Sequence, residues 1–375
     1  MKKLIGMLAV TMVMTACQAQ NNHQEETESN DDAINENTVE HQENNEEEES
    51  TEEQYEEFST YTFEDYEDPF VSVDELTEVL GGQYEYDDVN KALTITMNDR
   101  EFYLVYEVPV LEVNGVYLDS DEVFVMEDDE GNPYVSKAFI EEGLETEYEY
   151  EESSSTLLVH WEENVVEAWG DYGQEEVDIH SFSPEEMVDF LSFLQTPIEG
   201  ASVSTVESHL PGAPRDYRNG EHEGIDWYDF ASGTEITTDT PIYAMAEGVV
   251  VRVDDDFEDY PSHEVRDEDL ELAAEVGFTP EYIFDRLRGQ QVWVQYENGV
   301  MIRFAHLDSI PEELELGQEV DEETVIGFVG NSGTSHAMNQ DDGGLHLHKD
   351  LLIYGELFWE PFTLEETSYI LRELW

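Results

Sequence analysis

The chain has very little cysteine and few positively charged residues. Each of these absences excludes a class of protein. Its 375 residues include one cysteine and 14 Lys+Arg, against 94 Asp+Glu. A single cysteine excludes a disulfide framework and any metal site built from several thiolates. The formal net charge of −80 excludes a nucleic-acid-binding protein, because too few cations are present to neutralise a row of phosphates.

The acidic residues are spread along the whole chain. Residues 18–60 hold 16 of the 94 acidic residues and no Lys or Arg, so most of the acidity belongs to the remainder. A folded surface with this charge repels itself at moderate salt while staying soluble. We interpret it as adaptation to high salt or to alkaline surroundings, with ordinary acidic drift as the alternative. The 39% of apolar residues is still enough to form a core.

The N-terminus has the pattern of an export signal. Residues 1–17 read MKKLIGMLAVTMVMTAC, with two lysines and then an apolar stretch that is too short to span a bilayer. Thr15, Ala16 and Cys17 resemble a bacterial lipobox, although Met14 stands where that motif usually has Leu. This resemblance implies an exported protein that faces the cell wall and is anchored to the outer face of the membrane through a lipid on Cys17. A plain secretory signal is the alternative.

Two segments are predicted to link other parts of the chain and to carry no functional site. Residues 18–60 lack the apolar side chains needed to offset ordering entropy, so we expect a disordered acidic tether. Residues 166–200 are expected to form a helical connector. Ser183 and Pro184 are a typical helix start, and the helix should end before Pro197.

An internal repeat lies between these segments. PFVSVDELTEVLGGQYEYDDVNKALTITM begins at Pro69, and PYVSKAFIEEGLETEYEYEESSSTLLVHW begins at Pro133. Each copy predicts a short helix, a YxY strand, a turn and a second strand. The pattern resembles the N-terminal domain of copper amine oxidases, which implies an α+β two-repeat stalk over residues 61–165 that acts as a spacer or touches the wall. We expect no copper site, because His160 is the sole histidine there, and it is predicted to lie on a sheet face.

Two short extended pieces near the C-terminus carry residues suited to a metal. His222 and Asp226 are four apart, and His346 and His348 are two apart in a largely apolar strand. Each spacing puts both side chains on one face of an extended chain. Two imidazoles and one carboxylate suit a catalytic zinc, which keeps a fourth position open for water and lowers the pKa of that water. The pattern therefore predicts that these side chains meet at one point.

The surrounding sequence predicts antiparallel sheet. Residues 291–296 and 300–304 should form a hairpin through Asn298-Gly299, and the hairpin leads directly to His306. Glycine-marked turns also separate strands within residues 241–251, and residues 317–320 and 325–333 add another pair. Residues 201–375 should therefore be one mainly β domain.

Five motifs of this domain resemble the M23 family of zinc metallopeptidases, the lysostaphin-like peptidoglycan endopeptidases. In chain order they are HEGID, PIYAMAEGVV, NGVMIRFAHL, VIGFVGNSG and GLHLH. The resemblance covers residues 205–375. The stretch LPGAPRDYRNGEHEGIDWYDFASGT is similar to a subgroup that carries a helical insertion before the hairpin, here about residues 254–289. The expected fold is a mainly β, antiparallel-sheet peptidase domain with a small helical insertion.

The family resemblance also implies a role for each candidate residue. His222, Asp226 and His348 would bind Zn²⁺, His346 would act as general base, and His306 would stabilise or protonate the tetrahedral centre. The implied reaction is hydrolysis of amide bonds in peptidoglycan stem peptides or crosslinks. One alternative is a non-catalytic protein on the same scaffold that recruits or activates another wall enzyme, and another is carboxypeptidase specificity. The oligomeric state does not follow from the sequence.

The chain departs from the family after its HxH motif, where Lys349-Asp350 replaces the usual Phe-Glu. Asp350 shares a face with His346 and His348, so it either orients a ligand or is a solvated strand-end carboxylate. Lys349 points the other way and is predicted to be exposed or to pair with an acid. Further predictions concern His336 as a rim residue, His209 and His263 as surface residues, and Tyr217, Arg218 and Asn219 as candidates to line the cleft.

Overall fold

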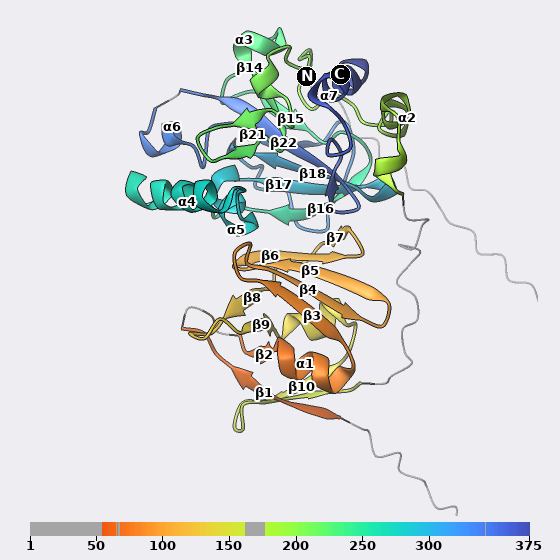
Figure 1. Ribbon diagram of the computed structural model, residues 1–375, viewed down its shortest axis with the longest axis vertical. Coiled ribbons are helices and arrows are strands. Elements are labelled where there is room, and N and C mark those ends of the chain that lie inside the picture. Colours follow the sequence, from red (N-terminus) through yellow and green to blue (C-terminus); the bar gives the residue numbers. More distant parts are fainter. Residues whose placement is uncertain (1–54, 65, 67, 162–176, 342) are drawn as a thin grey trace, which may run out of the picture. The chain divides into compact units, whose positions relative to one another are not determined.

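The computed structural model describes residues 55–64, 66, 68–161, 177–341 and 343–375 (Figure 1). The expected signal segment with Cys17, most of the expected tether, and residues 162–176 at the junction of stalk and connector lie outside the described residues. Residues 52–375 belong to one unit of contacting elements. Within the described part, no helix has the length and apolar character needed to cross a membrane.

The N-terminal domain consists of two antiparallel sheets. The first has the order β10-β11-β1-β2-β9-β8, with the bounds Tyr148–Glu151, Thr156–Val159, Glu56–Tyr61, Phe70–Ser72, Pro133–Ser136 and Val125–Glu127. The second is a meander of β3 (Gln83–Asp87), β4 (Ala92–Met97), β5 (Arg100–Val105), β6 (Val108–Val113) and β7 (Val116–Leu118). Residues 56–60 were expected in the tether, but they form β1 because Phe58 is buried and the strand pairs with both β11 and β2.

The two sequence repeats share their strands but differ in their helices. The predicted YxY strands are β3 and β10, and β4 and β11 are the second strands of the two copies. The helix of the first copy is α1 (Val73–Leu80), which begins where the Ser72 side chain accepts a hydrogen bond from the Glu75 backbone N–H. The second copy instead has a π-helix, η1 (Phe139–Gly143), whose first turn has no side-chain cap. A backbone contact takes the place of the cap, because the Ile140 N–H donates to Lys137 O at 3.0 Å.

The C-terminal domain is built on a large antiparallel sheet. Its order is β14 (Ile225–Tyr228), β22 (His346–Ile353), β18 (Val300–Ala305), β17 (Val292–Tyr296), β16 (Gly248–Val253) and β20 (Glu319–Val320), and β23 (Glu356–Leu357) also pairs with β22. Smaller sheets contain β15 (Pro241–Tyr243), β21 (Val325–Val329) and β19 (Leu307–Ser309), and separately β12 (Pro214–Arg215) and β13 (Gly220–Glu221). The predicted hairpin is β17–β18. The expected pairing of β20 with β21 is wrong, because β20 pairs with β16 and β21 with β15 and β19.

Helices cover the margins of this sheet. They are α2 (Pro184–Phe190), α3 (Asp229–Ser232), α4 (His263–Val276), α5 (Glu281–Arg288), α6 (Ser335–Met338) and α7 (Leu364–Leu374), with 3-10 turns η2 (Ile179–Ser181), η3 (Glu207–His209) and η4 (Glu297–Gly299). The predicted insertion is α4 and α5, which lie at the opposite end of the domain from α2 and α7 (Figure 1). The connector helix α2 starts with the predicted capping box. It buries Met187 in the domain core and packs on α7, so it belongs to the domain itself.

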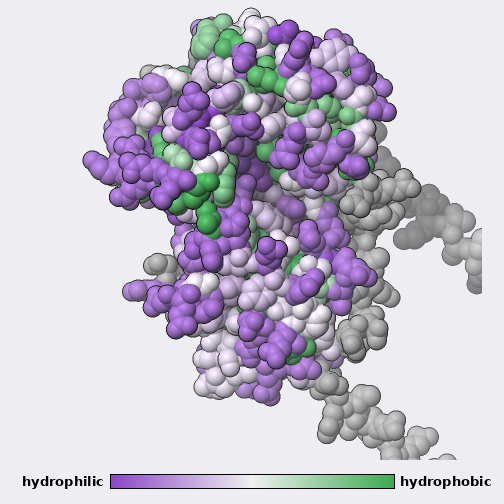
Figure 2. Space-filling model, viewed as in Figure 1, coloured by the Kyte–Doolittle hydropathy of each residue, from purple (hydrophilic) through white to green (hydrophobic). Residues whose placement is uncertain are grey.

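An apolar cluster joins the two domains. It contains Val105, Val108, Val110 and Tyr117 of the N-terminal domain and Val251, Trp293, Met301 and Leu352 of the large sheet. Arg303 Nη2 donates to the Tyr117 hydroxyl across this cluster at 3.0 Å. Elsewhere the visible face of the molecule is mostly hydrophilic (Figure 2), as the excess of acidic residues requires.

Candidate metal centre

Strand pairing brings the separated histidines and the aspartate together. The antiparallel register of β14 and β22 places Asp226 opposite His348. The register of β18 and β22 places Ala305 opposite His348, so that His306 follows at the end of the same strand. His222 lies three residues before β14, and its main-chain N–H donates to Ala213 O at 2.8 Å. The sequence prediction that these side chains meet at one point is therefore met by the geometry.

Three donor atoms lie close together, at separations slightly shorter than those of zinc ligands. His348 Nδ1 lies 2.8 Å from Asp226 Oδ1, His222 Nε2 lies 3.1 Å from the same oxygen, and the two nitrogens are 3.2 Å apart. Donors about 2.0–2.1 Å from a tetrahedral zinc are about 3.3 Å from one another. His222, Asp226 and His348 thus form one of two metal-compatible groups among the described residues, and His306, His346 and His348 form the other.

Backbone carbonyls fix the orientation of three imidazoles. The Nδ1–H groups of His222, His306 and His346 donate to Leu210 O, Ser332 O and Gly344 O at 3.1, 2.8 and 2.7 Å. A carbonyl oxygen can only accept, so each Nδ1 carries a proton and each neutral ring keeps its Nε2 lone pair free. This arrangement of histidines is typical of metal ligands and of general bases.

The remaining nitrogen of His348 is held by a buried carboxylate. Its Nε2 lies 2.8 Å from Asp350 Oδ1, and Arg288 Nε donates to Asp350 Oδ2 at 2.7 Å. Asp350 is completely buried, so its alternative interpretation as a solvated strand-end carboxylate is wrong. The hydrogen bond orients His348 so that Nδ1 faces Asp226 and His222.

Two glycines make this packing possible. A side chain at Gly224 would place its Cβ 2.6 Å from both Asp350 Oδ1 and His348 Cε1, which are the partners of the orienting hydrogen bond. Gly289 ends α5 with φ +71°, and a Cβ there would lie 2.4 Å from the carbonyl carbon of Ser332, whose oxygen accepts from His306. Only glycine combines that conformation with so close an approach.

Burial and charge set the protonation of the cluster. Burial lowers the pKa of His346 to about 4, and burial together with His346 and His348 lowers the pKa of His306 well below its usual range. Both rings are therefore neutral at pH 7. His348 differs, because Asp350 and Asp226 overcome the effect of burial and raise its pKa to about 9. A metal ion would have to displace a proton from His348, which makes binding dependent on pH.

The cluster lies in a cleft of about 630 Å³. Tyr228 stacks on His346 with ring centroids 4.4 Å apart. The insertion supplies part of the wall through Arg266, Phe284, Leu287 and Arg288. Phe284 lies between two guanidinium groups, with Arg218 4.8 Å and Arg288 4.9 Å from its ring centroid. The insertion therefore belongs to the site, a role that its sequence did not reveal.

Several single-residue predictions differ from the structure. Tyr217 and Arg218 line the cleft as proposed, whereas Asn219 does not. His336, expected at the rim of the cleft, is not among the residues that line it; it is exposed and bonded to Asp341. His209 is buried and lies 2.8 Å from the Ser204 hydroxyl, so its prediction as a surface residue is wrong. His263 is exposed as expected.

Lys349 was expected to be exposed or paired with an acid, and this prediction is also wrong. Its side chain is fully buried, and Nζ lies 3.5 Å from the Trp375 ring centroid. Alternation along the strand correctly placed Lys349 on the face opposite His348. That face is buried because the C-terminal Trp375 covers it.

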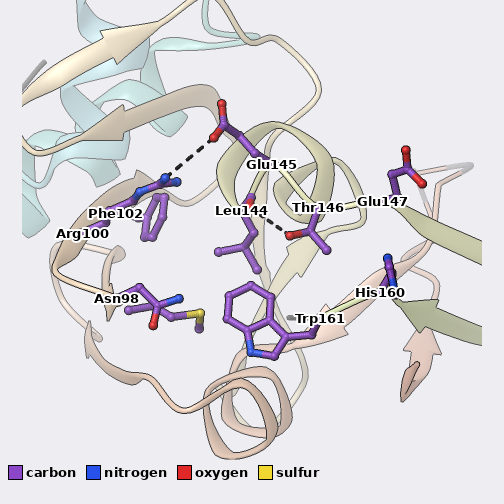
Figure 3. A pocket seen from close by; sticks show the side chains of 10 residues that line it. Asn98, Arg100, Phe102, Leu144, Glu145, Thr146, Glu147, His160 and Trp161 are labelled. Carbon is purple, nitrogen blue, oxygen red and sulfur yellow. Dashed lines mark hydrogen bonds and ion pairs between the residues drawn. The ribbon is translucent and has the colours of Figure 1, made fainter. Parts of the chain in front are cut away.

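A separate pocket of about 240 Å³ opens in the N-terminal domain (Figure 3). His160 and Trp161 line it together with Arg100, which pairs with Glu145 at 3.7 Å. Among the described residues, the groups that could hold a metal lie in the C-terminal domain and do not include His160.

Comparisons with known proteins match one family model to the N-terminal domain and several solved structures to larger parts of the chain. Residues 51–159 match the family model of the copper amine oxidase N-terminal domain. No curated protein matches the chain.

Solved structures that are similar include peptidases from three bacteria. A zinc-containing peptidase from Vibrio cholerae is 13% identical over 71% of this chain and 48% of its own, with a TM-score of 0.28. A putative peptidase M23 from Pseudomonas aeruginosa is 17% identical over 64% and 85%, with a TM-score of 0.27. The catalytic domain of the prophage-encoded M23 protein EnpA from Enterococcus faecalis is 19% identical over 46% and 96%, with a TM-score of 0.27. The chain thus spans less than half of the Vibrio protein, and these likenesses concern the fold alone.

Proposed function

We propose that this protein is a lipid-anchored zinc endopeptidase that hydrolyses amide bonds in the peptide part of peptidoglycan. The supporting observation is the spacing of His222 Nε2, Asp226 Oδ1 and His348 Nδ1 at 2.8 to 3.2 Å. Two further neutral imidazoles, His306 and His346, lie beside these atoms in an open cleft. Such a set of donors fits one divalent ion with room for water and substrate.

Zinc at this point would polarise the substrate carbonyl and lower the pKa of a bound water. His346 is suited to general base catalysis, because its Nε2 lone pair is free and Gly344 O and Tyr228 hold the ring in place. His306 also starts as an acceptor, since its Nδ1 proton is committed to Ser332 O. A proton that the attacking water releases to His306 Nε2 would pass readily to the leaving amine, because burial and the neighbouring histidines disfavour the charged form of His306.

The peptidoglycan substrate and the location at the membrane come from the sequence. The five M23-like motifs support peptidoglycan stem peptides or crosslinks as the substrate. The lipobox-like end at Cys17 supports a lipid anchor on the outer face of the membrane. The acidic tether and the N-terminal domain would then carry the catalytic domain into the wall.

Metal analysis of variants tests the ligand assignment. We expect one zinc per chain in the purified wild-type protein. Asp226→Ala and His348→Ala should lose zinc, whereas His306→Ala and His346→Ala should keep it. His180→Ala is a matched control, because His180 is exposed and bonds to Glu356 outside the cleft. Zinc retention by the His348→Ala variant would contradict the ligand set.

Release of peptides from purified peptidoglycan, followed by mass spectrometry, tests the activity. The wild type and His180→Ala should release fragments, and a strong chelator or any of the four site variants should prevent this. Fragments that are cut within crosslinks identify an endopeptidase, and loss of terminal residues alone identifies a carboxypeptidase. Stoichiometric zinc without any cleavage would favour the alternative of a regulatory or recruiting protein.

A further inference from the structure

The cleft concentrates the rare cations of this chain. Four arginines, Arg215, Arg218, Arg266 and Arg288, line it, although the whole chain has 14 Lys+Arg against 94 Asp+Glu. In a protein with this charge, an anionic ligand is repelled from most of the surface, and a cleft in which arginines outnumber acidic side chains becomes the favoured place for it. The four arginines differ in how many of their donors remain available to such a ligand.

Two of these arginines already serve the protein itself. Arg218 forms two hydrogen bonds with the Glu223 carboxylate, at 3.2 and 2.7 Å. Arg288 donates to Asp350, which orients His348. Their charges are neutralised by these partners, so they are poor candidates for binding a substrate anion.

Arg266 is different. It comes from α4 of the insertion and lines the cleft, and its guanidinium forms no hydrogen bond or ion pair with any residue that the structure describes. Its Nε is shielded from solvent without a partner. A buried donor on a charged group is costly when it is left unpaired, and a ligand in the cleft would supply the missing acceptor.

Arg215 also has donors to spare. Its Nη1 donates to Ser208 O at 2.8 Å, and Nη2 lies 3.5 Å from Asp226 Oδ2. A guanidinium has five N–H donors, so Arg215 could bind a further acceptor close to the candidate metal ligand. Three carboxylates also line the cleft. Glu223 pairs with Arg218 and Asp226 with His222, and among the described residues Asp216 forms no ion pair with Arg266 or Arg215.

We propose that Arg266, assisted by Arg215, binds a free carboxylate of the substrate peptide next to the amide that is cleaved. This inference rests on the proposed function and specifies its substrate class. The preferred crosslink carries an unamidated carboxylate near the scissile bond, and an uncharged bridge is a poor substrate. A guanidinium recognises a carboxylate through two parallel hydrogen bonds, which gives both affinity and orientation. Arg266 is accordingly a specificity-determining residue supplied by the helical insertion.

Two synthetic peptides test the proposal on the full, zinc-loaded protein. Both are crosslinked stem-peptide dimers, one with free carboxylates and the other with carboxamides at the same positions. We expect kcat/KM of the wild type to be higher for the carboxylate dimer by about ten- to hundredfold, the size typical of hydrogen bonds to a charged group. Arg266→Gln should lose most of that preference by slowing cleavage of the carboxylate dimer alone, and Arg266→Lys should restore only part of it.

Arg372→Gln is the matched control, because Arg372 is an exposed arginine on α7 and does not line the cleft. It should leave both rates unchanged. Equal losses for the two dimers in Arg266→Gln, or no loss for either, would overturn the proposal.

A binding measurement separates this proposal from the proposed function. Calorimetry with the His346→Ala protein, in which cleavage is expected to be absent, should give tighter binding of the carboxylate dimer. Adding Arg266→Gln should make the two affinities equal. If the wild type cleaves neither dimer while this binding difference persists, the hydrolase assignment fails and the carboxylate site stands. If cleavage occurs without any preference, the carboxylate site fails and the hydrolase stands.

Discussion

Two buried carboxyl groups near Arg303 behave in opposite ways. Asp350 lies on β22 opposite Arg303, and Glu112 lies on β6 of the N-terminal domain, at its interface with the C-terminal domain. Burial by itself raises the pKa of either group. Arg288 and His348 nevertheless hold the pKa of Asp350 well below its usual range, whereas the pKa of Glu112 is raised to about 7.

The two pKa values differ because the carboxyl groups have different hydrogen-bond donors, and not because one is more deeply buried than the other. Asp350 accepts hydrogen bonds from a guanidinium and from an imidazole, and both donors favour the charged carboxylate. Glu112 receives a hydrogen bond from the Tyr117 hydroxyl, and the charge of Arg303 is partly engaged by Tyr117 and Glu281. The candidate site therefore keeps its buried charge by arranging ionic partners, while the domain interface leaves its acid close to neutral.

The largest effect is expected at Asp350. Asp350→Asn keeps the size of the side chain but removes the charge that Arg288 and His348 require. Zinc affinity should fall by about 10- to 100-fold, as is typical when the partner of a ligating histidine is lost. The free energy of unfolding should drop by about 3–5 kcal/mol, because the partner charges stay buried.

Competition with a chromogenic chelator measures the affinity, and thermal unfolding measures the stability. Asp350→Ala should act in the same direction, and Glu112→Gln is the matched control for removing a buried carboxyl group without touching the cluster. Wild-type zinc affinity in the Asp350→Asn protein would show that the orienting hydrogen bond is unimportant.

The sequence predicted which residues and strands form the site better than it predicted the contacts that orient these residues. Alternation along an extended chain correctly grouped His346, His348 and Asp350 on one face, and Asn298-Gly299 marked the hairpin before His306. These are local patterns. The partner of Asp350 is Arg288, 62 residues away in an insertion, and no periodicity encodes such a contact.

The same limit explains the error at Lys349. Alternation indicates which face of a strand a side chain occupies but not what covers that face. The scarcity of arginine was the signal that could have identified Arg215 and Arg266, since a chain with 14 basic residues has few to spare beside its candidate metal ligands.

An intermediate effect is expected at Glu112, and it depends on pH. Below about pH 4.5 the carboxyl group is protonated in both states and contributes nothing. As the pH rises toward 7, the unfolded chain releases this proton before the folded protein does, so stability decreases over that range and levels off above it. Glu112→Gln should remove this loss, which is on the order of 3 kcal/mol at pH 8.

Thermal unfolding of the wild type and the Glu112→Gln protein between pH 4 and 8 measures this difference. The gap between the two melting temperatures should widen up to about pH 7, the pKa of the folded state, and then stay constant. Zinc content and cleavage should be unchanged in the variant. A gap that does not vary with pH would mean that Glu112 is charged in the folded protein, like Asp350.

The smallest effect is expected at Lys349, the buried lysine on the opposite face of β22 from Asp350. Its Nζ lies 3.0 Å from Met245 Sδ and against the Trp375 ring, and no carboxylate forms an ion pair with it among the described residues. Burial therefore lowers the pKa of Lys349 well below its usual value.

Lys349→Met keeps the volume and removes the amine. The gain from relieving burial exceeds the lost contact with the Trp rings, so we expect a net stabilisation of about 1 kcal/mol at pH 7. The unfolded chain binds the extra proton, so the wild type gains stability as the pH rises toward the usual lysine value, and the advantage of the variant should shrink accordingly. Urea unfolding at pH 7 and pH 9.5 measures the stabilisation by the variant and its decrease with pH. A variant that is less stable at both values would show that the ammonium is retained by the Trp375 and Trp227 rings, and that an aromatic cage can replace the ionic partners that Asp350 requires.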